Sequence, residues 1–244
     1  MSRALHSESR RTPDSIDHPQ VTCEVLMEAE IRNRPSFANV LVRLEPGESL
    51  IAEADAMASM SASVQIRTRW NGGFFAAIMR RIFGGESLFI NQFSADEPSE
   101  IVLTQALPGD IECLDLEGMT FFLQPGAFLA CEPTVRLGLK WAGFASFIGG
   151  EGLFRLQVSG QGRVWFSSYG GIYVREVTDE YIVDTGHLVG YEPSISIKVG
   201  LAGGIFSSFF GGEGLITRVK GPGRIYLQSR NFSALSAWVN SQIW

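Results

Sequence analysis

The sequence predicts an all-β protein built from three repeated β units with pseudo-threefold symmetry, followed by a short C-terminal helix. A phrase rich in glycine occurs three times, as GGESLF at 84–89, GGEGLF at 149–154 and GGEGLI at 211–216. A segment of alternating apolar and polar residues precedes each phrase. The chain also holds 27 glycines among 244 residues, more than the roughly 7% of an average protein, which indicates many tight turns.

The alternating segments have a period of two residues, which is typical of a strand with one buried face. They are SVQIRTRW at 63–70, TVRLGLKW at 134–141 and SISIKVGL at 194–201. A glycine turn and a short apolar stretch follow each segment, before the glycine–glycine–glutamate phrase. We therefore expect Val64, Val135 and Ile195 to occupy equivalent positions in three β units.

A turn sequence precedes each alternating strand. Its copies are EPGESLIAE at 45–53, QPGAFLACE at 124–132 and DTGHLVGYE at 184–192. Gly47, Gly126 and Gly186 hold the same place in this alignment, and a turn that requires positive φ favours glycine there. The sequence therefore predicts a turn and a further strand in front of each alternating strand.

A second match follows the glycine phrase in two of the units. VSGQGRVWFSS at 158–168 agrees nearly position by position with VKGPGRIYLQS at 219–229, whereas the first unit has QFSADEPSEIVLT at 92–104. A period of about 60 to 70 residues is typical of an internal repeat. We expect a flexible polar tail and then a single β domain made of three repeats. The tail covers 1–20, the domain 21–244, and the repeats about 24–98, 99–168 and 169–232.

The end of the chain has a different period. In FSALSAWVNSQIW, the residues Phe232, Trp238 and Val239 lie three or four positions from Leu235, so that the four share one face of a helix. The sequence therefore predicts a short C-terminal helix. Helical spacing also occurs at 74–83, where a turn or two of helix is expected.

The repeated motifs resemble a known family. GGEGLF followed by Gly-x-Gly-Arg, together with the turn and its later Leu and Glu, is similar to the "altered inheritance of mitochondria" family of mitochondrial biogenesis proteins, in particular its uncharacterised bacterial branch. The likeness covers roughly 21–232. It implies a fold like the tryptophan RNA-binding attenuation protein, a β-sandwich or double-stranded β-helix unit present three times. It implies no agreed activity, and for eukaryotic members it implies a role in inner-membrane organisation.

Composition and charge exclude several classes of protein. The net charge is −6 and the pI about 5.2, with no run of Lys and Arg, which disfavours nucleic acid as a partner. Cys23, Cys113 and Cys131 form no CxxC motif and no disulfide framework, so a reducing compartment is expected. The polar N-terminus shows neither a secretory signal nor an Arg-rich amphipathic presequence. We expect a cytoplasmic protein, with a peripheral position on a membrane as the alternative.

Two glycine motifs have the spacing of a phosphate-binding loop. Gly160 and Gly162 precede RVWFSS, and Gly221 and Gly223 precede RIYLQS. A dinucleotide site needs a third glycine and a helix directly after the loop, whereas strands are predicted here. We interpret both motifs as hairpin turns and expect no cofactor.

Metal and catalytic sites lack the usual side chains. The histidines are His6, His18 and His187, too scattered to form a metal site, and no nucleophile has a histidine partner. Cys113 and Cys131 stand in apolar strands and are expected in the core. The repeated carboxylates leave two alternatives: a hard cation on a threefold axis, or hydrogen bonds to their own glycine turns, which we favour. They are Glu86, Glu151 and Glu213, with Glu53, Glu132 and Glu192 as a second set.

The connectors at 74–83, 144–148 and 205–210 are apolar where loops are normally polar. We expect them to gather at one end of the domain, where they either cap the core or form an interaction surface. Their phenylalanines are Phe74, Phe75, Phe83, Phe144, Phe147, Phe206, Phe209 and Phe210. The expected partner is a further copy of the chain in a homo-oligomer, and the alternative is a membrane surface. Whether a small molecule binds is left open.

These observations favour a non-enzymatic structural or interaction protein that self-associates. The alternative is a small-molecule or RNA binding module, by analogy with the attenuation protein. The acidic pI and the lack of a basic, aromatic strand face count against RNA.

Overall fold

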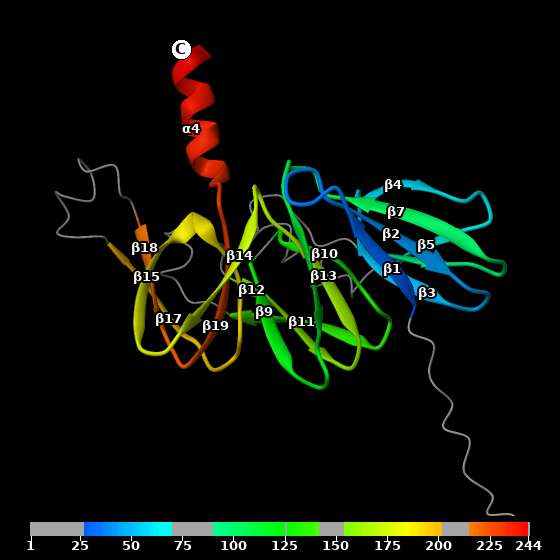
Figure 1. The fold of residues 1–244 in the computed structure, drawn as a ribbon, viewed down its shortest axis with the longest axis horizontal. Helices are drawn as coiled ribbons and strands as arrows, with labels where there is room; N and C mark the ends of the chain where they lie inside the picture. Colours follow the sequence, from blue (N-terminus) through cyan, green and yellow to red (C-terminus); the bar gives the residue numbers. More distant parts are fainter. Residues whose placement is uncertain (1–26, 70–89, 125, 142–153, 202–214, 244) are drawn as a thin grey trace, which may run out of the picture.

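The computed structural model describes residues 27–69, 90–124, 126–141, 154–201 and 215–243. Within these ranges the chain forms strands in four antiparallel sheets, one short 3-10 turn and one helix. The sheets, named I to IV here, follow one another along the long axis of the molecule, from the N-terminal strands at one end to the C-terminal strands at the other (Figure 1). The prediction of an all-β protein is confirmed.

Sheets I and IV are the narrow end sheets. Sheet I has the order β1-β2-β7-β4, and sheet IV has the order β15-β18-β17. The bounds in sheet I are β1 Glu28–Arg32, β2 Asn39–Leu44, β7 Ser99–Thr104 and β4 Met57–Met60. The bounds in sheet IV are β15 Glu180–Asp184, β18 Leu215–Lys220 and β17 Ser196–Leu201.

Sheets II and III are the wide inner sheets, with six strands each. Sheet II runs β5 Gln65–Arg69, β6 Ile90–Ser94, β3 Ser49–Glu53, β10 Phe128–Cys131, β13 Arg163–Ser167 and β8 Ile111–Asp115. Sheet III runs β11 Val135–Trp141, β12 Phe154–Gly160, β9 Thr120–Leu123, β16 Leu188–Tyr191, β19 Gly223–Gln228 and β14 Ile172–Val177. Each inner sheet therefore joins two groups of three strands, at the pair β3–β10 in sheet II and the pair β9–β16 in sheet III.

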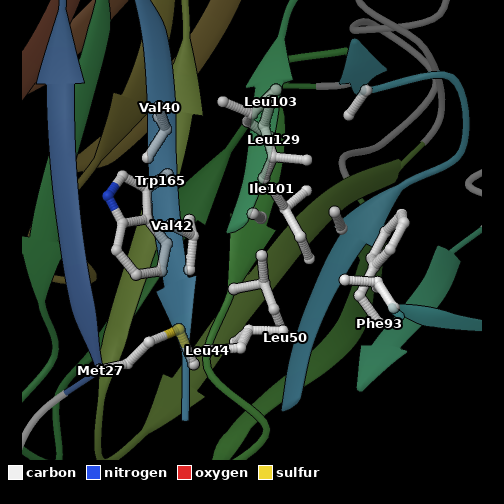
Figure 2. Close-up of a cluster of buried hydrophobic side chains, with 14 of the residues drawn as sticks. Met27, Val40, Val42, Leu44, Leu50, Phe93, Ile101, Leu103, Leu129 and Trp165 are labelled. Atoms are coloured by element: carbon white, nitrogen blue, oxygen red, sulfur yellow. The ribbon is translucent and has the colours of Figure 1, made fainter. Parts of the chain in front are cut away.

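Three apolar cores fill the spaces between consecutive sheets. The first core lies between sheets I and II, and Figure 2 shows Trp165 of β13 in one cluster with Val40 and Val42 of β2. The second core lies between sheets II and III, and the third between sheets III and IV. Sheets II and III are thus covered on both faces, which explains why all four residues of β10 and of β16 are buried.

The alternating strands β5, β11 and β17 begin in the same way. Val64, Val135 and Ile195 are buried, and each donates its backbone N–H to the carbonyl oxygen three residues earlier, at 3.1, 3.0 and 3.0 Å. Each strand then pairs with the strand that follows it in the chain, β6, β12 or β18. The three valine or isoleucine residues therefore share one local environment, as the alternation predicts.

The alignment of 45–53 with 124–132 is wrong. The strand of the first segment, β3, pairs with β6 and β10, whereas the strand of the second segment, β10, pairs with β13 and β3. By its pairing partners, β3 matches β9 and β15, since these three strands pair with β6, β12 and β18. In the same way β4 matches β10 and β16, which pair with β13 and β19 as β4 pairs with β7. The physical reason is that each stretch of chain makes two similar turns, so that Gly47 (φ 88°) corresponds to Gly118 (φ 88°) and not to Gly126.

The predictions for turns and helix have mixed outcomes. Gly47 and Gly126 have positive φ, as expected, but Gly186 does not. Gly186 lies in the 3-10 turn Thr185–His187, where a Cβ atom would meet the side chain of Asn231, so that glycine provides space and not positive φ. The C-terminal helix is confirmed as α4 Phe232–Ile243, and it extends away from the sheets (Figure 1).

Candidate functional site

The phenylalanines predicted as an interaction surface and the first set of repeated carboxylates lie outside the described residues, so their roles stay predictions. They are Phe74, Phe75, Phe83, Phe144, Phe147, Phe206, Phe209, Phe210 and the carboxylates Glu86, Glu151 and Glu213. The structure does place the ends of the three connectors. Each one joins two adjacent antiparallel strands of one sheet, β5 to β6, β11 to β12 and β17 to β18.

The second set of carboxylates forms two ion-pair clamps. Glu132 follows β10, and its carboxylate accepts the backbone N–H of Arg163 at 2.9 Å and the Nε–H of the same arginine at 2.7 Å. The Arg163 guanidinium also lies 5.1 Å from the ring centroid of Trp165 and donates to the carbonyl oxygen of Met27. This clamp ties together the segment before β1, the end of β10 and the start of β13.

Glu192 follows β16 and makes the same contacts to Arg224. Its carboxylate accepts the backbone N–H of Arg224 at 2.9 Å and the Nε–H at 2.6 Å. Ser61, which follows β4, makes a shorter version, since its hydroxyl accepts the backbone N–H of Glu100 at 2.9 Å. The sequence-based expectation that these carboxylates bind their own turn is therefore wrong, because the donor lies about 30 residues further along the chain.

Glu53 does not belong with these two glutamates. It ends β3, whereas Glu132 and Glu192 follow β10 and β16, and the residue that corresponds to them by pairing is Ser61. The three glutamates therefore do not converge on one point. Within the described ranges, no group of three or more His, Cys, Asp or Glu side chains is placed to hold a metal ion.

Each Gly-x-Gly motif directly precedes the arginine of a clamp, Arg163 or Arg224. Each motif leads into a strand, as predicted, but the turn is not a hairpin: β12 and β13 lie in sheets III and II, and β18 and β19 lie in sheets IV and III. Gly162 has φ +115°, and a Cβ atom there would lie 2.7 Å from the Glu132 carboxylate. Glycine is required because the carboxylate occupies the space beside the turn, and the N–H that could hold a phosphate already binds Glu132.

The thiols of Cys113 and Cys131, the cysteines that the structure describes, are poor nucleophiles at neutral pH. Burial raises the pKa of Cys113 to about 11 and that of Cys131 to about 12. Cys131 is fully buried in the second core, as predicted, and Cys113 is partly buried against the first core. His187, the histidine that the structure describes, hydrogen-bonds through Nδ1 with the carbonyl oxygen of Gln228 at 2.7 Å, in a structural contact.

A row of cations and aromatic rings crosses sheet III where its two halves join. Lys140 Nζ lies 4.7 Å from the Phe122 ring centroid, the Phe122 and Tyr191 rings stack at 5.2 Å, and the Arg155 guanidinium lies 5.4 Å from the Tyr191 centroid. Phe122 and Tyr191 are buried, so they are not available as a stacking platform for bases. The row strengthens the β9–β16 pair, and the sequence contained no short-range signal for it.

Comparisons with known proteins agree with this architecture. A family model described as mitochondrial biogenesis AIM24 matches residues 29–230. An uncharacterised protein of Streptococcus pyogenes serotype M6 is 31% identical over 206 residues, which cover 80% of this chain and 82% of that protein. The crystal structure of a Streptococcus pyogenes protein superposes with a TM-score of 0.74 at 28% identity, covering 88% of this chain and 99% of that one.

Proposed function

We propose, from the premise that the chain belongs to the mitochondrial biogenesis AIM24 family, that it acts as a structural protein that self-associates and not as an enzyme. The observation that carries the proposal is the difference between the inner and the end sheets. Among the described residues, sheets II and III have six strands and a core on both faces, whereas sheets I and IV have four and three strands and a core on one face. A sheet left narrow and half covered is a surface that a partner can complete.

We further infer that the chain is a triplication with units at 39–104, 111–167 and 172–228, each a TRAP-like unit of six strands. The pairing order within these three stretches supports this division, as does a bulge that recurs in one strand of each. The bulges lie between Met57 and Ser59 in β4, Phe128 and Ala130 in β10, and Leu188 and Gly190 in β16. The first boundary moves from 98 to beyond 104, because β7 pairs with β2 and β4, while the boundary near 168 is kept, between β13 and β14.

The mass of the native protein tests self-association. Size-exclusion chromatography with light scattering is expected to give a whole multiple of the 26.8 kDa chain mass over a hundredfold range of concentration. The far-ultraviolet circular dichroism of the same sample serves as the control for folding. A folded protein that runs at the mass of one chain over the whole range contradicts the proposal.

Contact with a lipid surface is the second candidate, and helix α4 favours it. Phe232, Trp238, Val239 and Ile243 are exposed, although an apolar face on a helix is normally buried. The helix carries no acidic residue in its first turn and no basic residue in its last. Its polar residues are Ser, Asn and Gln, so that lipid binding would rest on apolar insertion and not on attraction to anionic headgroups.

No helix within the described ranges is long and apolar enough to cross a membrane.

Flotation with vesicles tests this candidate. The protein is expected to float with small, highly curved phosphatidylcholine vesicles and to gain nothing from added phosphatidylserine. The variant Trp238→Ser with Phe232→Ser is expected to stay in the bottom fraction, whereas Ser233→Ala with Ser241→Ala, on the polar face, floats like the wild type. If the protein stays at the bottom with every vesicle, the lipid candidate is rejected while self-association is unaffected.

A further inference from the structure

We propose that one copy of the chain binds a second copy head to tail, through antiparallel pairing of β15 in one copy with β4 in the next. This inference rests on the self-association proposed above, for which it names the two surfaces and the register. It follows from the way in which the chain already joins its own sheets.

The two junctions inside the chain have the same register. In sheet II the pairs are Ala52↔Ala130 and Ile51↔Cys131, and in sheet III they are Leu123↔Gly190 and Phe122↔Tyr191. Rows of paired residues across each sheet connect these positions to the alternating strands. In sheet II, Thr68, four residues after Val64, pairs with Asn91, which pairs with Ala52. In sheet III, Leu139, four residues after Val135, pairs with Leu156, which pairs with Leu123.

In sheet IV, Val199, four residues after Ile195, pairs with Thr217, which pairs with Val183 in β15. At the other end of the molecule, the bulge of β4 places Ser59 where β10 has Ala130 and β16 has Gly190. Among the described strands, β15 pairs with β18 alone and β4 pairs with β7 alone. The register of the two filled junctions therefore predicts the pairs Val183↔Ser59 and Ile182↔Met60 at the junction between copies.

Exposure separates the filled junctions from the open ends. Ile51 and Phe122 are 7% and 4% exposed, whereas Ile182, at the same position of β15, is 50% exposed. On the other side, Ala130 and Gly190 are buried, whereas Ser59 is exposed. Of the four positions predicted to pair between copies, Ile182 and Ser59 therefore face solvent at the ends of the chain, whereas Val183 is buried in the third core and Met60 is partly buried.

The β4 edge carries no charge or proline that would oppose pairing, and it shares its length and its bulge with β10 and β16, which do pair. Its sequence is Met-Ala-Ser-Met at 57–60. Its residue at the junction position is small, like the alanine and glycine at the filled junctions, so that a neighbouring strand can approach. Adding β4-β7-β2-β1 of one copy to β15-β18-β17 of another completes a sheet of the same kind as the inner sheets.

The two edges are too far apart to meet within one chain. β4 and β15 lie at opposite ends of the longest axis (Figure 1). The contact is therefore heterologous, with different surfaces on the two copies. Such a contact gives a ring if the rotation between copies closes and a fibre if it does not.

Two edge variants and their mixture test the proposal. Ile182→Lys blocks β15 and leaves β4 intact, whereas Ser59→Lys blocks β4 and leaves β15 intact. Both positions are exposed in the single chain, so that neither lysine disturbs its fold. Each variant alone is expected to run at the mass of one chain, and an equimolar mixture is expected to give a complex of two chains. Val174→Lys, at an equally exposed position on another sheet edge, is the matched control and keeps the wild-type mass.

A covalent trap checks the register by a second route. A chain with both Met60→Cys and Ile182→Cys is expected to give a ladder of disulfide-linked multimers on oxidation, while each single cysteine variant gives at most linked pairs. If the wild type is an oligomer but both lysine variants keep its mass and the double cysteine variant gives no ladder, the head-to-tail contact is rejected and self-association stands. If the wild type is itself a single chain, both proposals fall.

Discussion

The Glu132–Arg163 clamp and the Glu192–Arg224 clamp make the same hydrogen bonds in different surroundings. The side chains of Glu132 and Arg163 are 10% and 17% exposed, whereas those of Glu192 and Arg224 are 24% and 48% exposed. The first clamp is covered by Met27 and Trp165, and in the part of the chain that the structure describes no such cover lies over the second. The same motif is therefore expected to contribute different amounts to stability, because water screens an exposed ion pair and is largely excluded from a buried one.

The largest effect is expected for Glu132→Ala. The change removes the carboxylate that accepts the Nε–H and the backbone N–H of Arg163 in a poorly hydrated place, and leaves the guanidinium with the Met27 carbonyl oxygen as its remaining acceptor among the described residues. The free energy of unfolding is expected to fall by about 2–4 kcal/mol, measured by urea denaturation. Glu192→Ala is the matched control. Equal losses in the two variants would show that burial does not separate the clamps.

The next effect is expected at the glycine beside each clamp. Gly162→Ala forces a side chain into positive φ and places its Cβ 2.7 Å from both the Glu132 carboxylate and the Thr134 hydroxyl. We expect a loss of about 1–3 kcal/mol. Gly223→Ala, at φ +152°, meets the flexible Ser194 hydroxyl at 2.5 Å and is expected to cost less. Thermal unfolding of both variants measures the difference, and a larger loss at Gly223 contradicts the comparison.

A smaller effect is expected for Glu192→Ala itself. An exposed pair contributes about 0.2–1 kcal/mol, since solvent screens the charges. The loss is expected to shrink further in about 1 M NaCl, where the Debye length is about 3 Å. Denaturation at low and high salt tests this. A loss that does not depend on salt would mean that the clamp acts through its backbone hydrogen bond and not through charge.

The smallest effect is expected when the clamp is built where the chain has none. Ser61→Glu together with Glu100→Arg places the same pair after β4. The gain is offset by loss of the Arg43–Glu100 ion pair, whose Nε and carboxylate oxygen lie 3.1 Å apart, so that stability changes by less than about 0.5 kcal/mol. Urea denaturation of the double variant beside each single variant measures the coupling. A gain above about 1 kcal/mol would mean that position, more than burial, sets the strength of the clamp.

Sequence reasoning succeeded where strands have one buried face. β5, β11 and β17 lie at the ends of their sheets, so that they alternate visibly and their first residues could be matched. β10, β13 and β16 are buried on both faces. Trp165 on β13 is the largest side chain in the first core, and no sequence pattern predicted this role. Continuous apolar runs carry no period from which the register could be read.

The candidate site was predicted less well than the fold. Glu132 and Glu192 were singled out as turn carboxylates, but the arginines that they bind lie on strands that follow a connector outside the described residues. The alignment error at 45–53 has a similar origin, because the Pro-Gly signal stands before β3 in the first stretch, at 46–47, but before β10 in the second, at 125–126. Local sequence patterns identify turns, but they do not say which strand a turn leads to.

The sequence by itself determined an all-β chain, the turns at Gly47 and Gly126, the alternating strands that begin after Val64, at Val135 and after Ile195, and the C-terminal helix, because these depend on backbone preference and on period. Only the tertiary structure decided which strands share a sheet, how deeply each clamp is buried, and that β4 and β15 are left at the two ends. Those outcomes depend on contacts between residues far apart in the chain. Ile51, Phe122 and Ile182 are all apolar, and only their neighbours in space make the first two buried and the third exposed.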